Sequence, residues 1–570
     1  MKLKGLALLT GALALQATSS AFAVNLDAEC DIDVFISGAS AQDNTLVAQV
    51  QNLMLSTGTI GATGVTNGSV FRGDEDNSWR LIIGQADNSK IAGGLSSTNP
   101  VLCVHKRSEG GSAWGVQPVV QNAVGTHPNG QTVGTPINFM LGVDCDAGTS
   151  LCSQSEVGES VLISPDAGLS DVEPAVFNGD NTPGAAVTAG EGEGAQDTAL
   201  DPTTLTGMTA SDVAGLEVFQ QAMFPFGVGV NPEFYAALQV CQGMYPSFAA
   251  QAADPLAYDS LDLMPSLTHS QIVSLYTGFS NGALSLPCDN IPSDYVDAAN
   301  PLGPGVINVL SVAQASGAGP AGFNTQVCRR VNGSGTHAQF RLKVLGVGCQ
   351  SSGALDFATV DIPGLVNFIG NSGSSDMGRC MGGTVSDRGI QPTTTSWKIG
   401  FQATDKVDEF SATLPGGGLA APAAGNAGYW RFIKVDGAAP TLANAAYGGW
   451  FDAVQATLQR RAGATAADRN YFHDEINGGS ATDVENFLTQ LIANFGDIVT
   501  VGGANFETPG NAGATTWFGG SLVINGSGCT VSGTGFDATS NPCSSVTHEI
   551  GTLNNCLVPV NNVSGILDSQ

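Results

Sequence analysis

The chain reads Cys328-Arg329-Arg330-Val331-Asn332-Gly333-Ser334-Gly335-Thr336 at its most informative point. From Arg330 onward this stretch holds a guanidinium, an amide, two hydroxyls and two glycines. An arginine offers a planar fork of N–H donors, glycines let backbone N–H groups approach an anion, and short hydroxyls complete the shell. The residues His337–Leu342 predict a helix, whose N-terminus would favour negative charge. The stretch therefore predicts a loop that holds a small tetrahedral oxyanion, and a plain Gly-Ser-Gly turn is the alternative.

A strand, a small-residue turn and a helix are predicted near the start of the chain. Ile32–Ile36 is typical of a strand, Ser37–Ala41 forms the turn, and Asp43–Met54 carries apolar residues at a helical period. Such a unit places backbone N–H groups at the carboxyl edge of a sheet. The alternative is an ordinary connection between a strand and a helix.

Two further strands are predicted at Pro100–His105 and Val161–Ser164. The first runs into Lys106–Gly115, a basic turn rich in glycine and serine that echoes the loop at Arg330. The second leads to Leu169–Pro174. Because strands alternate with helical patterns, we expect an α/β fold with largely parallel sheets.

A helix is predicted before the arginine loop, where Thr268 and Gln271 form a capping-box pattern and Gly278 is a stop signal. The remaining assignments are a loop or insertion at Asn178–Ala210, a core segment at Met223–Val240, strands at Val306–Leu310, Trp397–Phe401 and Trp430–Val435, a turn at Asp436–Gly437 and a helix at Val484–Phe495.

The N-terminus has the pattern of a secretory signal peptide. Met1–Lys4 is basic, Gly5–Leu15 is apolar, and Ala21-Phe22-Ala23 predicts cleavage after residue 23. The apolar run is too short for a membrane anchor, and no later segment is long and apolar enough to span. We therefore expect a protein exported to the periplasm or beyond the cell, with no stable membrane insertion.

The mature chain is acidic and poor in charge. The formal net charge is −30, and removing two lysines with the signal peptide makes it −32. Nucleic acid is an improbable partner, because its recognition needs basic patches. Charged residues make up only 12% and glycine numbers 75, which favours an exported protein with long loops over a charge-rich disordered chain.

Twelve cysteines, an even number, all lie in the mature chain and predict disulfides in an exported protein. Cys145–Cys152 is the expected local bridge. Two clusters are expected to pair mostly within themselves or with a neighbour, and they are Cys328, Cys349, Cys380 and Cys529, Cys543, Cys556. The spacing of cysteines and histidines does not fit a zinc site.

Signatures of common enzymes are missing from the sequence. Ser112 lacks the flanking glycines of a nucleophile elbow, His548-Glu549 does not extend to a zinc-protease motif, and no P-loop or dinucleotide fingerprint occurs. The acidic stretches Asp74–Asn77 and Asp144–Asp146 could touch calcium, but they lack EF-hand spacing, and a solvated acidic face is preferred. We expect no catalytic residues, no cofactor and no metal, hence not an enzyme.

The order of the anion-friendly segments resembles the phosphate-binding proteins of bacterial phosphate ABC transporters, in the type 2 periplasmic binding protein superfamily. The segments are Ser37–Ala41, Leu169–Asp171, Leu267–Gly278 and Arg330–Thr336. The motif Arg-x-x-Gly-Ser-Gly-Thr is the most specific of them, and Asp436–Thr441 resembles a segment near that family's C-terminus. The likeness covers roughly Asp31 to Phe495, with large gaps.

The resemblance implies a role for individual residues. Ala39, Ser40 and Ala41 would supply N–H groups and a hydroxyl from the first lobe, and Ser170 would line the cleft. Asp171 would accept a hydrogen bond from a protonated phosphate, which disfavours sulfate. The second-lobe ligands would be Arg330, Ser334, Gly335 and Thr336.

The chain departs from the family pattern at several points. Ala41-Gln42-Asp43 replaces an aromatic-proline ending, and Asn332 stands where the family often has an acidic residue. About 130 residues separate the first turn from Ser170, and the Cys-rich C-terminal segment has no counterpart. We expect a two-lobed type 2 periplasmic-binding-protein fold, α/β, with large insertions and a Cys-rich, β-rich C-terminal appendage. The expected divisions are a signal peptide at 1–23, lobe 1 at 24–175, lobe 2 at 176–395, a return to lobe 1 at 396–500 and the appendage at 501–570.

Two functions fit these expectations. The first is an exported solute-binding protein that captures phosphate, or a phosphate-bearing small ligand, between two closing lobes and delivers it to an ABC transporter permease. The alternative is a secreted or cell-surface structural protein, such as an adhesin, that reuses the same scaffold. The disulfides, glycine-rich loops and insertions favour this alternative.

Overall fold

The structure is a computed structural model that describes residues 24–61, 63–74, 78–108, 111–120, 136–153, 158–177, 207–254, 256–258, 260–278, 325–346, 366–371, 373–382, 397–404, 430–450, 452–469, 471, 480–503, 522–524, 537, 543–544, 546–547, 560–563 and 566–569. The predicted signal peptide, the predicted strand Val306–Leu310 and most of the predicted loop Asn178–Ala210 lie outside these residues.

One large sheet of twelve strands runs through the molecule. In pairing order the strands are β14 (Val366–Asn371), β13 (Thr325–Arg330), β15 (Trp397–Ala403), β11 (Leu216–Val230), β18 (Ala453–Arg461), β10 (Ala167–Ser170), β1 (Ile32–Gly38), β6 (Val101–Arg107), β5 (Trp79–Gln85), β4 (Ser69–Gly73) and β8 (Leu151–Cys152), with β16 (Arg431–Phe432) beside β11.

The sheet is mixed, so the prediction of largely parallel sheets was wrong. β1 is parallel to β6 and β10, and β13 is parallel to β14 and β15. The strands β11 and β18, however, pair antiparallel with each other and with their other neighbours β15 and β10. β11 and β18 carry the chain between the two lobes in opposite directions. The middle of the sheet is therefore antiparallel.

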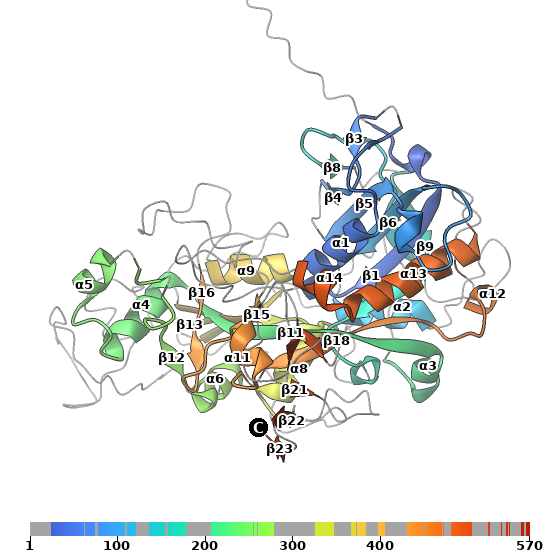
Figure 1. Cartoon of the computed structure of the whole chain (residues 1–570). Helices are drawn as coiled ribbons and strands as arrows, with labels where there is room; N and C mark the ends of the chain where they lie inside the picture. The colour runs from blue at the N-terminus through green and yellow to red at the C-terminus, as the bar shows by residue number, and fades with distance from the viewer. Residues whose placement is uncertain are drawn as a thin grey trace, which may run out of the picture.

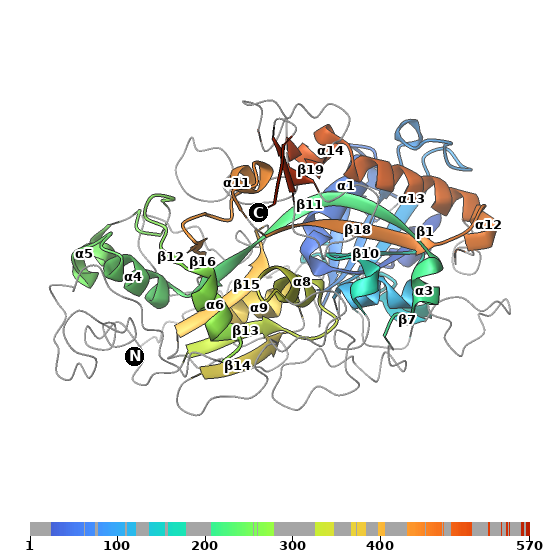
Figure 2. The same cartoon turned by 90° about the horizontal axis from the view of Figure 1, so that it is seen from below.

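The long strand β11 joins two lobes. Its first part, Leu216–Pro225, pairs with β18, and its last part, Phe226–Val230, pairs with β15. Pro225 lies at the change of partner, where a residue without an N–H costs no ladder bond. Figures 1 and 2 show β11 running from the group around β1 and β6 to the group around β13 and β14. The protein is therefore a two-lobed α/β fold, as predicted.

Helices cover each lobe. In the first lobe α13 (Ala481–Phe495) packs against β1 and α1 (Asp43–Asn52) packs against β5 and α13, with Val34, Leu46 and Phe487 fully buried in one apolar cluster. In the second lobe α8 (Gly335–Lys343) and α9 (Ser374–Gly382) lie against β13 and β15, and the helices α4 (Pro232–Cys241) and α6 (His269–Tyr276) lie farther out (Figure 2).

The helix caps follow the sequence closely. Thr268 and Gln271 form the predicted capping box of α6, and Ser480 and Asp483 form another on α13. The helix predicted from His337 begins two residues earlier, at Gly335, because the Ser334 hydroxyl accepts the His337 N–H at 3.4 Å and makes Ser334 the N-cap.

Three disulfides have both partners among the described residues. Cys145–Cys152 is confirmed as a local bridge, and Cys328–Cys380 confirms pairing within the cluster that contains both residues. A third bridge joins Cys30 to Cys103 on β6. The Cys328–Cys380 bridge ties β13 to the C-terminal half of α9.

The described residues beyond 503 fall mostly in short strands, which agrees with a β-rich C-terminal appendage. These strands are β19 (Val523–Ile524), β20 (Cys543–Ser544), β21 (Val546–Thr547), β22 (Val560–Val563) and β23 (Ile566–Ser569). Within the part of the chain that the structure describes, no helix has both the length and the apolar character to cross a membrane.

Candidate functional site

The candidate site lies where the ends of four strands bring their following loops together. In lobe 1 the parallel neighbours β6, β1 and β10 end at one edge of the sheet, which is the edge where α/β folds place ligands. In lobe 2, β13 ends beside them and leads to the first turn of α8. The loops that leave these four strands carry Ser40, Ser112, Asp171 and Ser334.

The two lobes are in direct contact at this point. The Ala113 N–H of lobe 1 donates to the Gly333 carbonyl of lobe 2 at 2.8 Å. Two glycines make this approach feasible. A Cβ on Gly335 would lie 2.2 Å from the Ser112 Oγ, and a Cβ on Gly111, which has φ +75°, would lie 3.0 Å from the Ser334 Cα. Any side chain at Gly335 would separate the lobes.

Asp171 is the carboxylate at the centre of this contact. Its side chain is buried, with 3% of the residue exposed. One oxygen accepts from Gln42 Nε2 at 3.3 Å, the other accepts from Ser112 Oγ at 3.2 Å, and the Asp171 N–H donates to the same serine oxygen at 3.0 Å. Burial raises the pKa of Asp171, while the Gln42 hydrogen bond, the Arg330 charge and the Ser112 hydrogen bond act in the opposite direction.

Arg330 enters the site from lobe 2 with a fixed side chain. Its Nε donates to the Asn371 carbonyl at 3.1 Å and its Nη1 to Ser374 Oγ at 3.5 Å. Burial and nearby arginines hold the pKa of His337 well below its usual range, so this histidine is neutral and its Nδ1–H donates to the Arg330 carbonyl at 2.6 Å. Side chain and backbone of Arg330 are both held by neighbours.

The first turn of α8 presents donors to the site. The Gly335 and Thr336 N–H groups donate to no described residue, as expected at the first positions of a helix. The Ser334 N–H, in contrast, donates to the Val331 carbonyl at 3.2 Å. Two backbone donors and the dipole of a nine-residue helix therefore remain for an anion.

Not every residue named from the sequence faces this point. The Ala39 N–H donates to the Leu169 carbonyl at 2.9 Å. The Ser170 hydroxyl donates to the Val172 carbonyl at 2.6 Å and accepts the Val172 N–H at 3.2 Å. Ala41 is buried in the main apolar cluster. The structure therefore brings Ser40, Asp171, Arg330 and Ser334–Thr336 to the interlobe contact, and it uses Ala39 and Ser170 in local backbone hydrogen bonds.

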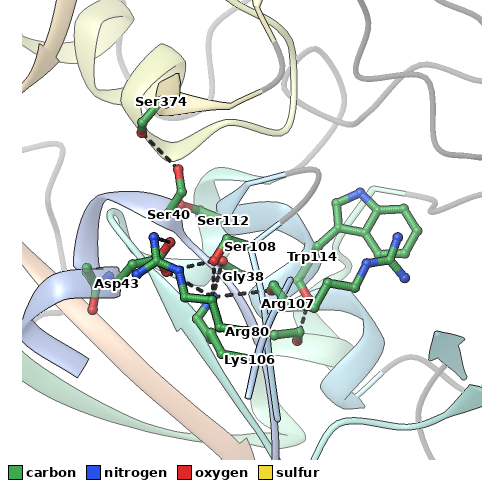
Figure 3. A network of polar contacts seen from close by, with 12 residues as sticks. Gly38, Ser40, Asp43, Arg80, Lys106, Arg107, Ser108, Ser112, Trp114 and Ser374 are labelled. Carbon is green, nitrogen blue, oxygen red and sulfur yellow. Dashed lines mark hydrogen bonds and ion pairs between the residues drawn. The ribbon is translucent and has the colours of Figure 1, made fainter. Parts of the chain in front are cut away.

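Sequence reasoning missed Ser112, Gln42 and Ser374 as members of the site. Ser112 could have been found, because it belongs to the Lys106–Gly115 turn that echoes the arginine loop. Gln42 directly follows the first predicted turn. Ser374 carried no signal, since it is the first residue of α9, and only the fold brings it to Ser40, whose hydroxyl lies 2.9 Å away (Figure 3).

A network of buried charges lies directly under the lobe 1 loops (Figure 3). The Asp43 carboxylate pairs with Arg80 at 3.2 Å and with Lys106 at 3.5 Å, and it accepts from the Ser108 hydroxyl at 2.7 Å. All four residues are buried. This network connects α1, β5 and β6 below the turn that carries Ser40.

Comparisons with known proteins give a fold likeness only. No known family profile and no curated protein matches the chain. Among solved structures, a candidate phosphate ABC transporter substrate-binding protein of Clostridium perfringens with bound phosphate is 10% identical, covers 81% of this chain and 96% of its own, and has a TM-score of 0.32. An ABC-type phosphate transport receptor of Vibrio cholerae is 13% identical over 57% of this chain and 74% of its own, with a TM-score of 0.23. PstS of Borrelia burgdorferi is 7% identical over 75% of this chain and 86% of its own, with a TM-score of 0.25. Likenesses this remote say nothing about what this chain binds.

Proposed function

We propose that this chain binds a tetrahedral oxyanion, phosphate or a close analogue, between its two lobes. The observation that carries the proposal is the buried Asp171 side chain packed against the first turn of α8, where the Gly335 and Thr336 N–H groups donate to no described residue. Arg330 from lobe 2 and the Ser40 hydroxyl from lobe 1 complete a shell of donors, while the Ser112 hydroxyl holds the Asp171 carboxylate. Ser334 caps the same helix.

The carboxylate gives this shell a preference among anions. A ligand oxygen and the Asp171 carboxylate oxygen are both acceptors, so a hydrogen bond between them needs one proton. Hydrogen phosphate carries that proton itself, whereas sulfate carries none and can be accepted only when Asp171 is protonated. Phosphate is therefore the proposed ligand at neutral pH.

The proposed biological role is that of an exported carrier that closes its lobes on the anion and delivers it to a membrane transporter of the ABC type. The strand β11, which belongs to both lobes, is the natural hinge because its partner changes at Pro225. Binding without chemical conversion fits a site composed of hydrogen-bond donors around one carboxylate. Residues 1–23 would direct export and be removed.

Calorimetric titration of the mature chain with phosphate and with sulfate tests the proposal. We expect phosphate binding in the micromolar range or tighter, lost in Arg330→Ala. Arg72→Ala, an exposed arginine on β4 in lobe 1, is the matched control and should bind as the unmodified chain does. A folded chain that binds neither anion would overturn the proposal and favour the structural, adhesin-like alternative.

A further inference from the structure

Lys106 is a completely buried ammonium beneath the lobe 1 half of the candidate site. It is the next-to-last residue of the strand β6, and 2% of the residue is exposed. Its Nζ donates to the Gly38 carbonyl at 2.6 Å, to Ser108 Oγ at 2.9 Å and to the Arg107 carbonyl at 3.2 Å. These three bonds use all three protons of the ammonium, so Lys106 does not touch a ligand directly.

The partners of Lys106 come from the elements that build the lobe 1 loops. Gly38 ends β1 and precedes the turn with Ser40. Ser108 begins the loop that carries Ser112. The ammonium therefore fixes two of the loops of the site relative to each other, as Figure 3 shows for Gly38, Lys106 and Ser108 around Asp43.

The charges around Lys106 do not cancel. Lys106 and Arg80 share Asp43 as their carboxylate partner among the described residues, so this cluster has an excess of one positive charge. Asp171, at the end of β10, is the other carboxylate whose field reaches Lys106, and Arg330 faces Asp171 from lobe 2.

A buried excess cation is costly unless an opposite charge compensates it. The cost is notable in a chain of net charge −30, whose carboxylates far outnumber its cations. An anion bound in the loops above would provide the compensation.

We propose that Lys106 is a positioning and specificity-determining residue of the oxyanion site, whose ammonium holds the Ser40 and Ser112 loops in place and supplies the positive charge that admits an anion beside Asp171. This inference rests on the proposed function. The inference adds that the site requires a charged ligand and rejects neutral tetrahedral molecules. It also adds that anion affinity depends on the charge of Lys106, which does not contact the ligand.

The charge on Lys106 is sensitive to pH. Burial lowers its pKa to about 8, while the attraction of Asp43 opposes the shift and the repulsion of Arg80 adds to it. The ammonium is thus present at neutral pH and is lost as the pH rises through 8. Anion affinity should fall over the same range, even though phosphate itself becomes more negative there.

The test is calorimetric titration of the mature chain with inorganic phosphate between about pH 7 and pH 9. We expect Lys106→Met to weaken binding by about tenfold or more at neutral pH and to remove the fall in affinity above pH 8. Lys106→Arg should retain the charge and much of the affinity. Lys90→Met, at a lysine that is 38% exposed and paired with Asp87, is the matched control and should change neither.

The outcomes separate the two proposals. A folded unmodified chain that binds no anion overturns the proposed function. An unmodified chain that binds phosphate, with Lys106→Met equal to it in affinity and pH profile, overturns only the role of Lys106. If Lys106→Met does not fold, as judged by circular dichroism and thermal melting, the unmodified chain still decides, because an affinity that is flat or rises through pH 8 contradicts the inference. Ser108→Ala, which keeps the charge, should weaken binding and leave the pH profile intact.

Discussion

The hydroxyl oxygens of Ser40 and Ser374 lie 2.9 Å apart, although 334 positions separate them in the chain. Ser40 follows β1 in lobe 1, and Ser374 begins α9 in lobe 2 (Figure 3). Ser374 also accepts from Arg330 at 3.5 Å, so a single hydroxyl links the arginine of one lobe to the first turn of the other. The pair therefore marks the closed arrangement of the lobes.

A double-mutant cycle on Ser40 and Ser374 should measure this link. Ser374→Ala removes the bridge between Ser40 and Arg330, and a hydrogen bond of this kind is worth roughly 0.5–1.5 kcal/mol. We expect each single alanine variant to weaken phosphate binding several-fold and the double variant to weaken it by less than the product of the two. Strictly multiplicative effects in calorimetry would show that the hydroxyls do not interact in the bound protein.

Substitution of Gly335 should block closure and leave the fold intact. Alanine is favoured over glycine within a helix, so Gly335→Ala is not expected to unfold α8. Its Cβ would lie 2.2 Å from Ser112 Oγ and 2.8 Å from the Asp171 Cβ, so the lobes must separate. We expect phosphate affinity to fall by about tenfold or more, with a larger radius of gyration in small-angle X-ray scattering.

Gly496→Ala is the control for this substitution. Its Cβ would meet only the Ala493 carbonyl, at the ordinary contact distance of 3.6 Å, next to the end of α13. This variant should bind and scatter as the unmodified chain does. Equal behaviour of Gly335→Ala and Gly496→Ala would contradict the close approach of the lobes at Gly335.

The preference for phosphate should depend on pH through Asp171. Burial raises the pKa of this carboxyl group, so its protonated form becomes populated at a higher pH than for an ordinary aspartate. Sulfate needs that protonated form, and its affinity should therefore rise as the pH falls. Competition titrations should show Asp171→Asn binding sulfate with no such rise, because an amide donates at every pH. A rise in sulfate affinity that persists in Asp171→Asn would rule out the carboxyl group as its cause.

The sequence was sufficient for those parts of the molecule that local chemistry determines. The helix cap at Thr268 and the strand–turn–helix at β1 follow from residue types within a few positions. Strand β10 was not predicted. Its sequence Ala-Gly-Leu-Ser has low strand propensity, and pairing with β1 and β18 makes it a strand.

The contacts between distant segments in the site could not be predicted from the sequence, because they depend on the three-dimensional fold. The resemblance predicted which loops would hold an anion, and the structure places Asp171, Arg330 and the start of α8 close together. Which atoms remain available depends on neighbours distant in the chain. The Ala39 N–H donates to the Leu169 carbonyl, and Ser374 reaches Ser40 from a helix that a disulfide ties to β13.

The Cys328–Cys380 disulfide should support both the stability of the fold and the affinity of the site. Cys328–Cys380 closes a loop of 52 residues and joins the strand that ends at Arg330 to the helix that begins at Ser374. Replacing both cysteines with serine should lower the free energy of unfolding by about 4 kcal/mol, from the chain-entropy relation. Binding should weaken too, because Arg330 and Ser374 are then free to shift apart.

The Cys145–Cys152 bridge is the matched control, since it closes only 7 residues and lies at the edge of lobe 1 next to β8. Its double serine variant should lose about 2 kcal/mol of stability and keep its phosphate affinity. Denaturant unfolding and calorimetry on both variants separate the two effects. If both variants lose affinity in proportion to lost stability, the Cys328–Cys380 bridge acts on the whole fold. If affinity falls only without that bridge, it acts by holding Ser374 within reach of Arg330.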